Sequence, residues 1–81
     1  MTYERARLVE QRLHRAVALI ESEPVDARLL ATKLEVSRPT VHRILAELRR
    51  RGCTIRSTHD ESGWRYELIG KSDEYRVRSS P

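Results

Sequence analysis

The sequence predicts a small, mainly α-helical domain in which three helices are followed by a β-hairpin. Two observations support this fold class. Apolar residues recur at spacings of three and four from Ala6 to Leu48, which is the period of amphipathic helices. After Gly52 the apolar spacing changes to two, which is the period of a strand. The 81 residues suit one domain, which we expect over residues 1–69, followed by a polar, flexible tail over residues 70–81.

The first helix is expected over residues 4–21. Pro24 ends this segment, because the residue before a proline avoids the α conformation. Leu8 and Leu19 lie on a second ridge, where they either pack at the edge of the core or form a contact between two copies of the chain. We take them as candidate dimer contacts. The core-facing stripe consists of Ala6, Val9, Leu13, Ala16, Val17 and Ile20.

Two further helices are expected on either side of a three-residue turn. Asp26 is suited to cap a short second helix, and Ser37 is suited to cap the third. Pro39 is tolerated in the first turn of the third helix, where its missing N–H costs nothing. That helix is expected over residues 37–51, because Gly52 occupies the position that glycine favours after a helix.

A β-hairpin is expected after Gly52. Residues 53–58 and 64–69 alternate in polarity, and the polar segment His59–Gly63 between them is typical of a turn. Trp64 and Tyr66 share one face of the second strand. We expect them to close the small core, since the chain has no Phe, although such a face also suits stacking on single-stranded bases.

Positive charge is concentrated in one part of the chain. The net charge of the whole protein is +4, but residues 37–56 contain six arginines and one glutamate, a net charge of +5. Arginine is the basic side chain whose planar guanidinium matches phosphates and guanine edges with two hydrogen bonds. This distribution favours a nucleic acid partner over the alternative of a solvated helix face.

Several function classes are not expected. No apolar run reaches the roughly 18 residues of a membrane span, so neither a transmembrane segment nor a secretory signal is expected. Cys53 is the only cysteine, which excludes an intrachain disulfide and a cysteine-based zinc site. No acid, base or nucleophile constellation is present. We therefore expect a cytoplasmic, nucleoid-associated binding protein, and no enzyme, cofactor or metal site.

The third predicted helix has one apolar side and one basic side. Val41, Ile44 and Leu48 cluster on one side at 100° per residue, whereas Arg43 and Arg50 lie opposite them. A helix with such an outward face can enter a DNA major groove about 12 Å wide. The order of a short helix, a turn and a capped helix is that of a helix-turn-helix unit, and the following hairpin makes it winged.

The segment from Leu29 to Leu68 resembles the winged helix-turn-helix of bacterial and phage transcriptional regulators. It is most similar to the type found in biotin-operon repressors and DeoR-like regulators of sugar operons. The resemblance covers about half of the chain. The residues that carry it are Leu30 and Leu34; Val36-Ser37-Arg38 with Thr40-Val41; Leu45, Leu48 and Gly52; and Gly63-Trp64.

The resemblance implies that the start of the third helix touches DNA and that the wing lies over the DNA backbone. Asp60 and Glu61 make the wing tip acidic, so Arg56 and Arg65 on the strands are better candidates for phosphate contact. Arg43 is the candidate for a base edge. The candidate DNA-binding residues are Ser37, Arg38, Pro39, Thr40, His42, Arg43, Arg50, Arg56 and Arg65.

The function expected from these residues is sequence-specific binding of double-stranded DNA by a small bacterial or phage transcriptional regulator. A homodimer is expected, because one such module has limited affinity. No small-molecule effector is implied. Two alternatives remain open: an architectural DNA binder, such as an excisionase or a replication accessory factor, and a winged-helix protein–protein interaction module that does not bind DNA.

Overall fold

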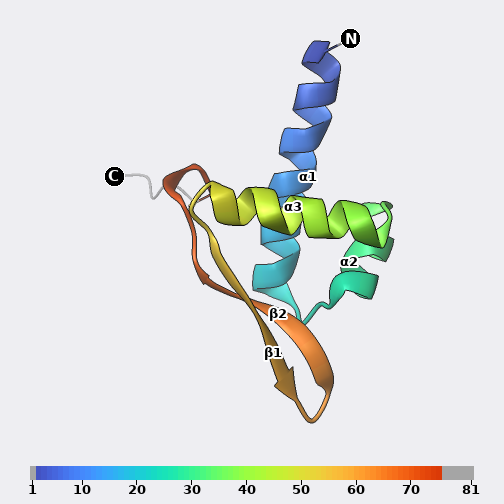
Figure 1. The fold of residues 1–81 in the computed structure, drawn as a ribbon, viewed down its shortest axis with the longest axis vertical. Helices are drawn as coiled ribbons and strands as arrows, with labels where there is room; N and C mark the ends of the chain where they lie inside the picture. The colour runs from blue at the N-terminus through green and yellow to red at the C-terminus, as the bar shows by residue number, and fades with distance from the viewer. Residues whose placement is uncertain (1, 76–81) are drawn as a thin grey trace.

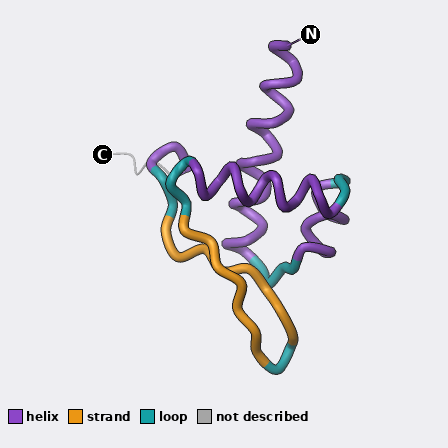
Figure 2. The backbone as a smooth tube through the Cα atoms, in the orientation of Figure 1, coloured by secondary structure: helices purple, strands orange, loops and turns teal. Residues whose placement is uncertain are grey.

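The computed structural model describes residues 2–75, which form three α-helices and a two-stranded antiparallel hairpin. This architecture confirms the predicted winged helix-turn-helix. Helix α3 crosses α1, and the hairpin extends away from the helices (Figure 1, Figure 2). The elements are α1 (Thr2–Ser22), α2 (Ala27–Leu34), α3 (Arg38–Arg50), β1 (Thr54–Asp60), β2 (Gly63–Gly70) and the 3-10 helix η1 (Asp73–Tyr75).

Both predicted N-caps are confirmed. Asp26 Oδ1 accepts a hydrogen bond from the Leu29 N–H at 2.8 Å, and Ser37 Oγ accepts one from the Thr40 N–H at 3.3 Å. Between the two helices, Glu35 adopts a left-handed conformation with φ of 58° and ends α2. These three local devices set the sharp turn that orients α3 relative to α2.

The core lies between the three helices and the adjoining end of the hairpin. The apolar stripe predicted for α3 is buried, and Leu30 and Leu34 of α2 are buried with it. In α1 the stripe is buried from Leu13 onward, but the prediction that Ala6 and Val9 face the core is wrong, because both lie in the first turns of α1 and are exposed. The Tyr66 N–H also donates to the Val25 carbonyl at 2.8 Å, which fastens β2 to the segment between α1 and α2. The most deeply buried side chains are Leu13, Val25, Leu30, Val41, Leu45 and Leu48.

The hairpin has a shorter turn than the sequence predicts. His59 pairs with Trp64 and Asp60 pairs with Gly63, so only two residues separate the strands. Gly63 has φ of +109°, a conformation that a residue with a side chain rarely adopts. Asp60 Oδ1 accepts a hydrogen bond from the Ser62 N–H at 2.8 Å. The chain therefore reverses tightly enough to extend both strands into the segment expected to be a turn.

The prediction that Trp64 closes the core is wrong, whereas the same prediction for Tyr66 is confirmed. Tyr66 packs against the core, but Trp64 is 64% exposed. Trp64 lies two residues nearer to the tip of the hairpin, which extends beyond the helices (Figure 1). Alternation placed both rings on one strand face but did not show how far along the strand the core extends.

Packing continues beyond the domain boundary expected at residue 69. Gly70 belongs to β2, and Tyr75 of η1 is buried with its ring 4.7 Å from the His14 ring. Tyr75 thus contributes to the core the aromatic side chain that was expected from Trp64. Residues 76–81 of the expected tail lie outside the described residues.

Candidate nucleic-acid interface

Helix α3 presents a polar face on the side opposite the core. Its buried residues are Val41, Ile44, Leu45 and Leu48, as its period predicts. Among the predicted DNA-binding residues of this segment, Thr40 is half-buried and the others are exposed: Ser37, Arg38, Pro39, His42, Arg43 and Arg50.

One edge of the α3 face meets α1. Thr40, Arg43 and Glu47 line a shallow hollow of about 320 Å³ together with Val9 and Arg12 of α1. The sequence did not indicate this arrangement, because helical period places residues within one helix but not against another. Arg43 consequently stands where the exposed face of α3 meets Val9 and Arg12 of α1.

The arginines of the α3 face differ in whether a carboxylate neutralises them. Arg50 is held by Glu47 through two contacts, Nε to Oε1 at 2.9 Å and Nη2 to Oε2 at 2.6 Å. Arg38 and Arg43, in contrast, form no ion pair with any side chain of residues 5–75, the range over which side chains are described. Uncompensated positive charge therefore lies at the start and middle of α3.

The other arginines at the end of α3 serve the fold. Arg51 contacts Glu10 of α1 at 2.8 Å and Glu47 of α3 at 2.8 Å, and it donates to the Tyr75 hydroxyl at 3.2 Å. Arg49 donates two hydrogen bonds to the Ile55 carbonyl, at 3.0 and 3.1 Å. Arg51 therefore joins α1, α3 and η1, and Arg49 joins α3 to β1.

These contacts shift the pKa values of the acidic partners. Hydrogen bonds from Arg50 and then Arg51 lower the pKa of Glu47 from 4.5 to about 2. The hydrogen bond from Arg51 likewise lowers the pKa of Glu10, against a smaller opposing effect of desolvation. Both carboxylates are therefore ionised at neutral pH and keep their guanidinium partners in place.

The two predicted strand arginines are also paired. Arg56 Nη2 lies 2.7 Å from Glu67 Oε1, its cross-strand neighbour. Arg65 Nε lies 3.2 Å from Asp60 Oδ2, although the contact does not have the geometry of a hydrogen bond. Half of the acidic charge at the wing tip is therefore balanced from within the hairpin, while Glu61 remains exposed.

Arg28 is a basic residue that the sequence reasoning missed. It is the second residue of α2, it is exposed, and it has no ion pair within the described part of the chain. It lines a hollow together with Arg38, Trp64 and Arg65. Its position in the first turn of α2 was the available signal. It lies outside residues 37–56, the segment in which the sequence concentrates its positive charge.

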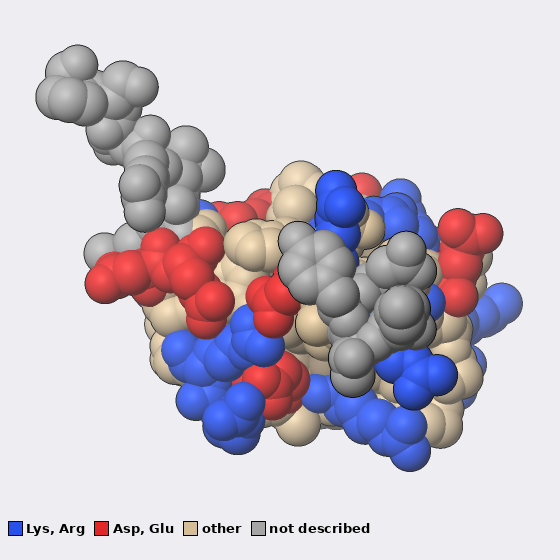
Figure 3. Space-filling model, turned by 90° about the horizontal axis from the view of Figure 1, so that it is seen from above, with Lys and Arg blue, Asp and Glu red and all other residues tan. Residues whose placement is uncertain are grey.

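The charged side chains are unevenly distributed over the surface. Viewed from above, Lys and Arg side chains gather along the lower edge of the molecule, and acidic side chains stand beside them at the left (Figure 3). This pattern agrees with the contacts, since some arginines face carboxylates and others do not. The arginines that have no carboxylate partner, rather than the total number of arginines, determine which ligands the surface attracts.

The two candidate dimer contacts lie in different surroundings. Leu8 is 51% exposed in the half of α1 that projects beyond the other elements, whereas Leu19 is half-buried and packs against the core (Figure 1).

Within residues 2–75, no helix has the length and apolar character to cross a membrane. The same described residues hold no cluster of His, Cys, Asp or Glu that suits a metal ion.

Comparison with known proteins agrees with this geometry. The family model described as an HTH domain matches residues 12–65, which include the second half of α1, all of α2, α3 and β1, and the start of β2. No curated protein and no solved structure shows significant similarity to the chain. The family match covers well over half of the sequence and coincides with the capped helix pair and its exposed basic face. The chain therefore belongs to the helix-turn-helix domain family, whose fold is a DNA-binding one.

Proposed function

We propose that this protein is a sequence-specific regulator of transcription that places α3 in the major groove of double-stranded DNA. The observation that carries the proposal is that Arg38 and Arg43 are exposed, and have no ion pair among the described side chains, on a capped helix whose other side is buried. An α-helix with its side chains is about as wide as the groove.

Each residue of the face has a proposed role. Arg43, in the middle of α3, reads a base edge, and His42 flanks it in the groove. Arg38 and Thr40 bind phosphate at the start of the helix, where the Ser37 cap and the free N–H groups also attract an anion. Pro39 shapes this first turn. Arg50, Arg56 and Arg65 contribute phosphate contacts only if DNA displaces their carboxylate partners.

We further propose that the protein acts as a homodimer in the cytoplasm, at the nucleoid. Support comes from the projecting half of α1, where Leu8 and Val9 are 51% and 44% exposed. Two linked modules read two half-sites, which raises both affinity and specificity over a single module. Regulation then follows from occupation of the site, and neither a cofactor nor a small-molecule effector is part of the proposal.

Selection of bound duplexes from a random pool tests the function. We expect the wild-type protein to enrich one sequence motif, because base-edge contacts discriminate between base pairs by about 1–3 kcal/mol each. A variant with both Arg38→Ala and Arg43→Ala is expected to lose this enrichment, whereas Arg5→Ala with Arg7→Ala, on the projecting half of α1, is the matched control. Failure of the wild type to enrich any motif would refute sequence-specific binding.

A further inference from the structure

Strand β1 has one edge that the hairpin does not use. Ser57 faces Tyr66 in the hairpin, and the Tyr66 N–H points away from β1, because it donates to the Val25 carbonyl. At such a position of an antiparallel ladder, the N–H and C=O groups of the two facing residues point away from each other. The backbone groups of Ser57 therefore point outward from β1, and those of His59, two residues further along, do the same.

Within the described residues, this outer edge of β1 is covered only at Ile55. The Ile55 carbonyl accepts two hydrogen bonds from Arg49, at 3.0 and 3.1 Å. No described residue outside the hairpin bonds to the outward backbone groups of Ser57 and His59. The strand contains neither proline nor lysine, which commonly protect an exposed strand edge. Another extended segment can therefore add to β1 from Ser57 toward the tip.

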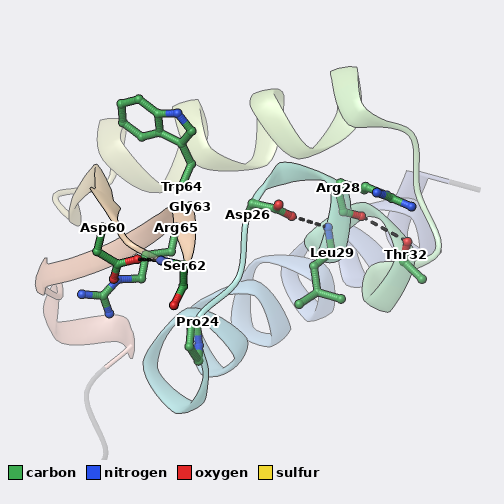
Figure 4. Close-up of a pocket in the computed structure, with 10 residues that line it drawn as sticks. All are labelled: Pro24, Asp26, Arg28, Leu29, Thr32, Asp60, Ser62, Gly63, Trp64 and Arg65. Atoms are coloured by element: carbon green, nitrogen blue, oxygen red, sulfur yellow. Dashed lines mark hydrogen bonds and ion pairs between the residues drawn. The ribbon is translucent and has the colours of Figure 1, made fainter.

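The two ends of this edge carry opposite charges. Arg49 and Arg56 lie at the end near the helices, whereas Asp60 and Glu61 lie at the tip. Arg49 and Glu61 have no ion pair with any side chain of residues 5–75. Asp60 contacts Arg65 (Figure 4), but its side chain remains 42% exposed, and that of Arg56 is 65% exposed. Such an edge is complementary to a second copy of itself that runs in the opposite direction.

We propose that β1 pairs with β1 of a second copy, antiparallel and centred on Thr58, so that the two hairpins form a four-stranded sheet. In this register Ser57 of each copy faces His59 of the other. The outward N–H and C=O groups of both residues then find backbone partners. Thr58 faces Thr58 of the second copy across the twofold axis.

The same register brings the opposite charges together. Arg56 of each copy lies opposite Asp60 of the other. Glu61 lies opposite Ile55, the residue whose carbonyl holds the Arg49 guanidinium. A shift by two residues, the smallest that keeps the outward groups facing each other, places Arg56 opposite an uncharged residue and loses both pairs with Asp60. The acidic tip, which is unsuited to phosphate, is therefore suited to the basic end of a second wing.

This contact is separate from the homodimer proposed through Leu8. The first half of α1 and the tip of the hairpin lie at opposite ends of the molecule (Figure 1). Two short strands bury little surface, so we expect the contact to form between free molecules only at high protein concentration, above that used for light scattering. On adjacent DNA sites it joins one dimer to the next and makes their binding cooperative. Only this last consequence rests on the proposed function.

Amide hydrogen exchange of the wild-type protein, followed by NMR, tests the edge without any substitution. The Arg56 and Thr58 amides point into the hairpin, so we expect them to exchange slowly at every protein concentration. The outward Ser57 and His59 amides are expected to exchange fast in dilute protein and more slowly as the concentration increases. Fast exchange of both at the highest concentration would overturn the proposal.

A cysteine at position 58 tests the register. Facing Cα atoms at this kind of position lie about 4.5 Å apart, which suits a disulfide. We therefore expect oxidised glutathione to convert Thr58→Cys to a covalent dimer. In Arg56→Cys the two new cysteines lie four residues apart along the paired strands, about 13 Å, which is too far for a disulfide. This position is the more exposed of the two, so random collision favours the control. Wild-type protein, with its buried Cys53, gives the background.

Reversal of the charge at the tip tests the complementarity. Glu61→Lys is expected to slow the cross-linking of Thr58→Cys several-fold, because the new ammonium group approaches Arg49 of the second copy. Glu35→Lys makes the same change at an exposed residue between α2 and α3 and is expected to have no such effect. Equal cross-linking of Thr58→Cys and Arg56→Cys, or equal effects of the two lysine variants, would overturn the proposal.

The outcomes are independent of the proposed function, because exchange and cross-linking are measured without DNA. Absence of duplex binding would overturn the proposed function and leave the pairing of β1 intact. Absence of concentration-dependent protection in a protein that selects a DNA motif would do the reverse.

Discussion

Among individual residues, the presence of a carboxylate partner separates arginines that stabilise the fold from those free to bind. Arg43 and Arg50 lie seven residues apart on the same side of α3, yet only Arg50 is paired, with Glu47. A guanidinium already held by two hydrogen bonds gains less from a phosphate, because the existing contacts must first be broken. Two arginines on the same helix face are therefore expected to differ in how much they contribute to DNA binding.

Substitution of these two arginines tests the distinction. We expect Arg43→Ala to weaken binding to the selected duplex by about 1–3 kcal/mol and to relax the preference at one base pair. Arg50→Ala is expected to have a clearly smaller effect, because Glu47 already neutralises it. Equilibrium titrations with the selected duplex and with a scrambled one measure both. A larger loss for Arg50→Ala would show that DNA opens this ion pair.

Glu47 makes stability depend on pH in a defined range. Its pKa is about 2 in the folded protein and 4.5 in the absence of its partners, so its ionised form favours the folded state. This contribution is complete above pH 4.5 and is lost as the pH falls toward 2.

We therefore expect the thermal unfolding midpoint to decrease over this acidic range. Glu47→Gln should show a lower midpoint at neutral pH and a shallower decrease, with Glu10 accounting for part of the remaining dependence. Circular dichroism melts at a series of pH values measure the midpoint. Parallel curves for the two proteins would contradict this role of Glu47.

Among the elements, α3 depends on its N-terminal cap for both its stability and its proposed contact. Ser37 ends the turn after α2, and its hydroxyl satisfies the Thr40 N–H. Free N–H groups remain at the same helix end, where an anion is favoured. The cap residue thus occupies the place where a phosphate approaches.

Two substitutions at Ser37 separate these effects. Ser37→Ala is expected to cost about 0.5–2 kcal/mol in the free energy of unfolding, because it removes the cap. Ser37→Asp retains a capping oxygen and so retains stability, but its carboxylate repels the phosphate and weakens duplex binding. Urea unfolding and duplex titration give the two quantities. Wild-type affinity in Ser37→Asp would place the phosphate elsewhere.

For the molecule as a whole, the number of arginines overstates the positive charge that is available to DNA. Several of the arginines are neutralised by carboxylates of the same chain, whereas Arg28, Arg38 and Arg43 have no ion pair among the described side chains. About three phosphate contacts per chain predict a slope of about −3 for the logarithm of affinity against the logarithm of salt concentration. A slope near −5 would indicate that ion-paired arginines are released to DNA.

The assembly state is the other property of the whole molecule. Leu8→Asp is expected to convert the proposed homodimer to a monomer in light scattering, because it places a charge on exposed apolar surface of α1. Ala18→Asp adds the same charge to an exposed position in the other half of α1 and is the control. Leu19→Asp is less informative, because Leu19 packs against the core and its loss also destabilises the monomer. A dimeric Leu8→Asp protein would remove Leu8 from the interface.

Local sequence features determined the elements and much of the face of α3. Caps at Asp26 and Ser37, the stop at Gly52 and the periods of three to four and of two are properties of neighbouring residues. They therefore do not depend on distant contacts, and the structure agrees with them except at Ala6 and Val9 of the α1 stripe, which are exposed. The burial of Val41, Ile44 and Leu48 followed from period alone, and with it the exposure of Arg43 on the opposite side.

Contacts between distant residues decided the rest. The ion pair of Arg51 with Glu10, the burial of Tyr75 and the exposure of Trp64 depend on how elements cross, and the hollow between α2 and the hairpin exists only once they have packed. Hydrophobic period and capping are properties of a single element, so they do not show where another element packs against it. The sequence by itself determined which residues form helices and strands; tertiary packing decided which arginines remained free.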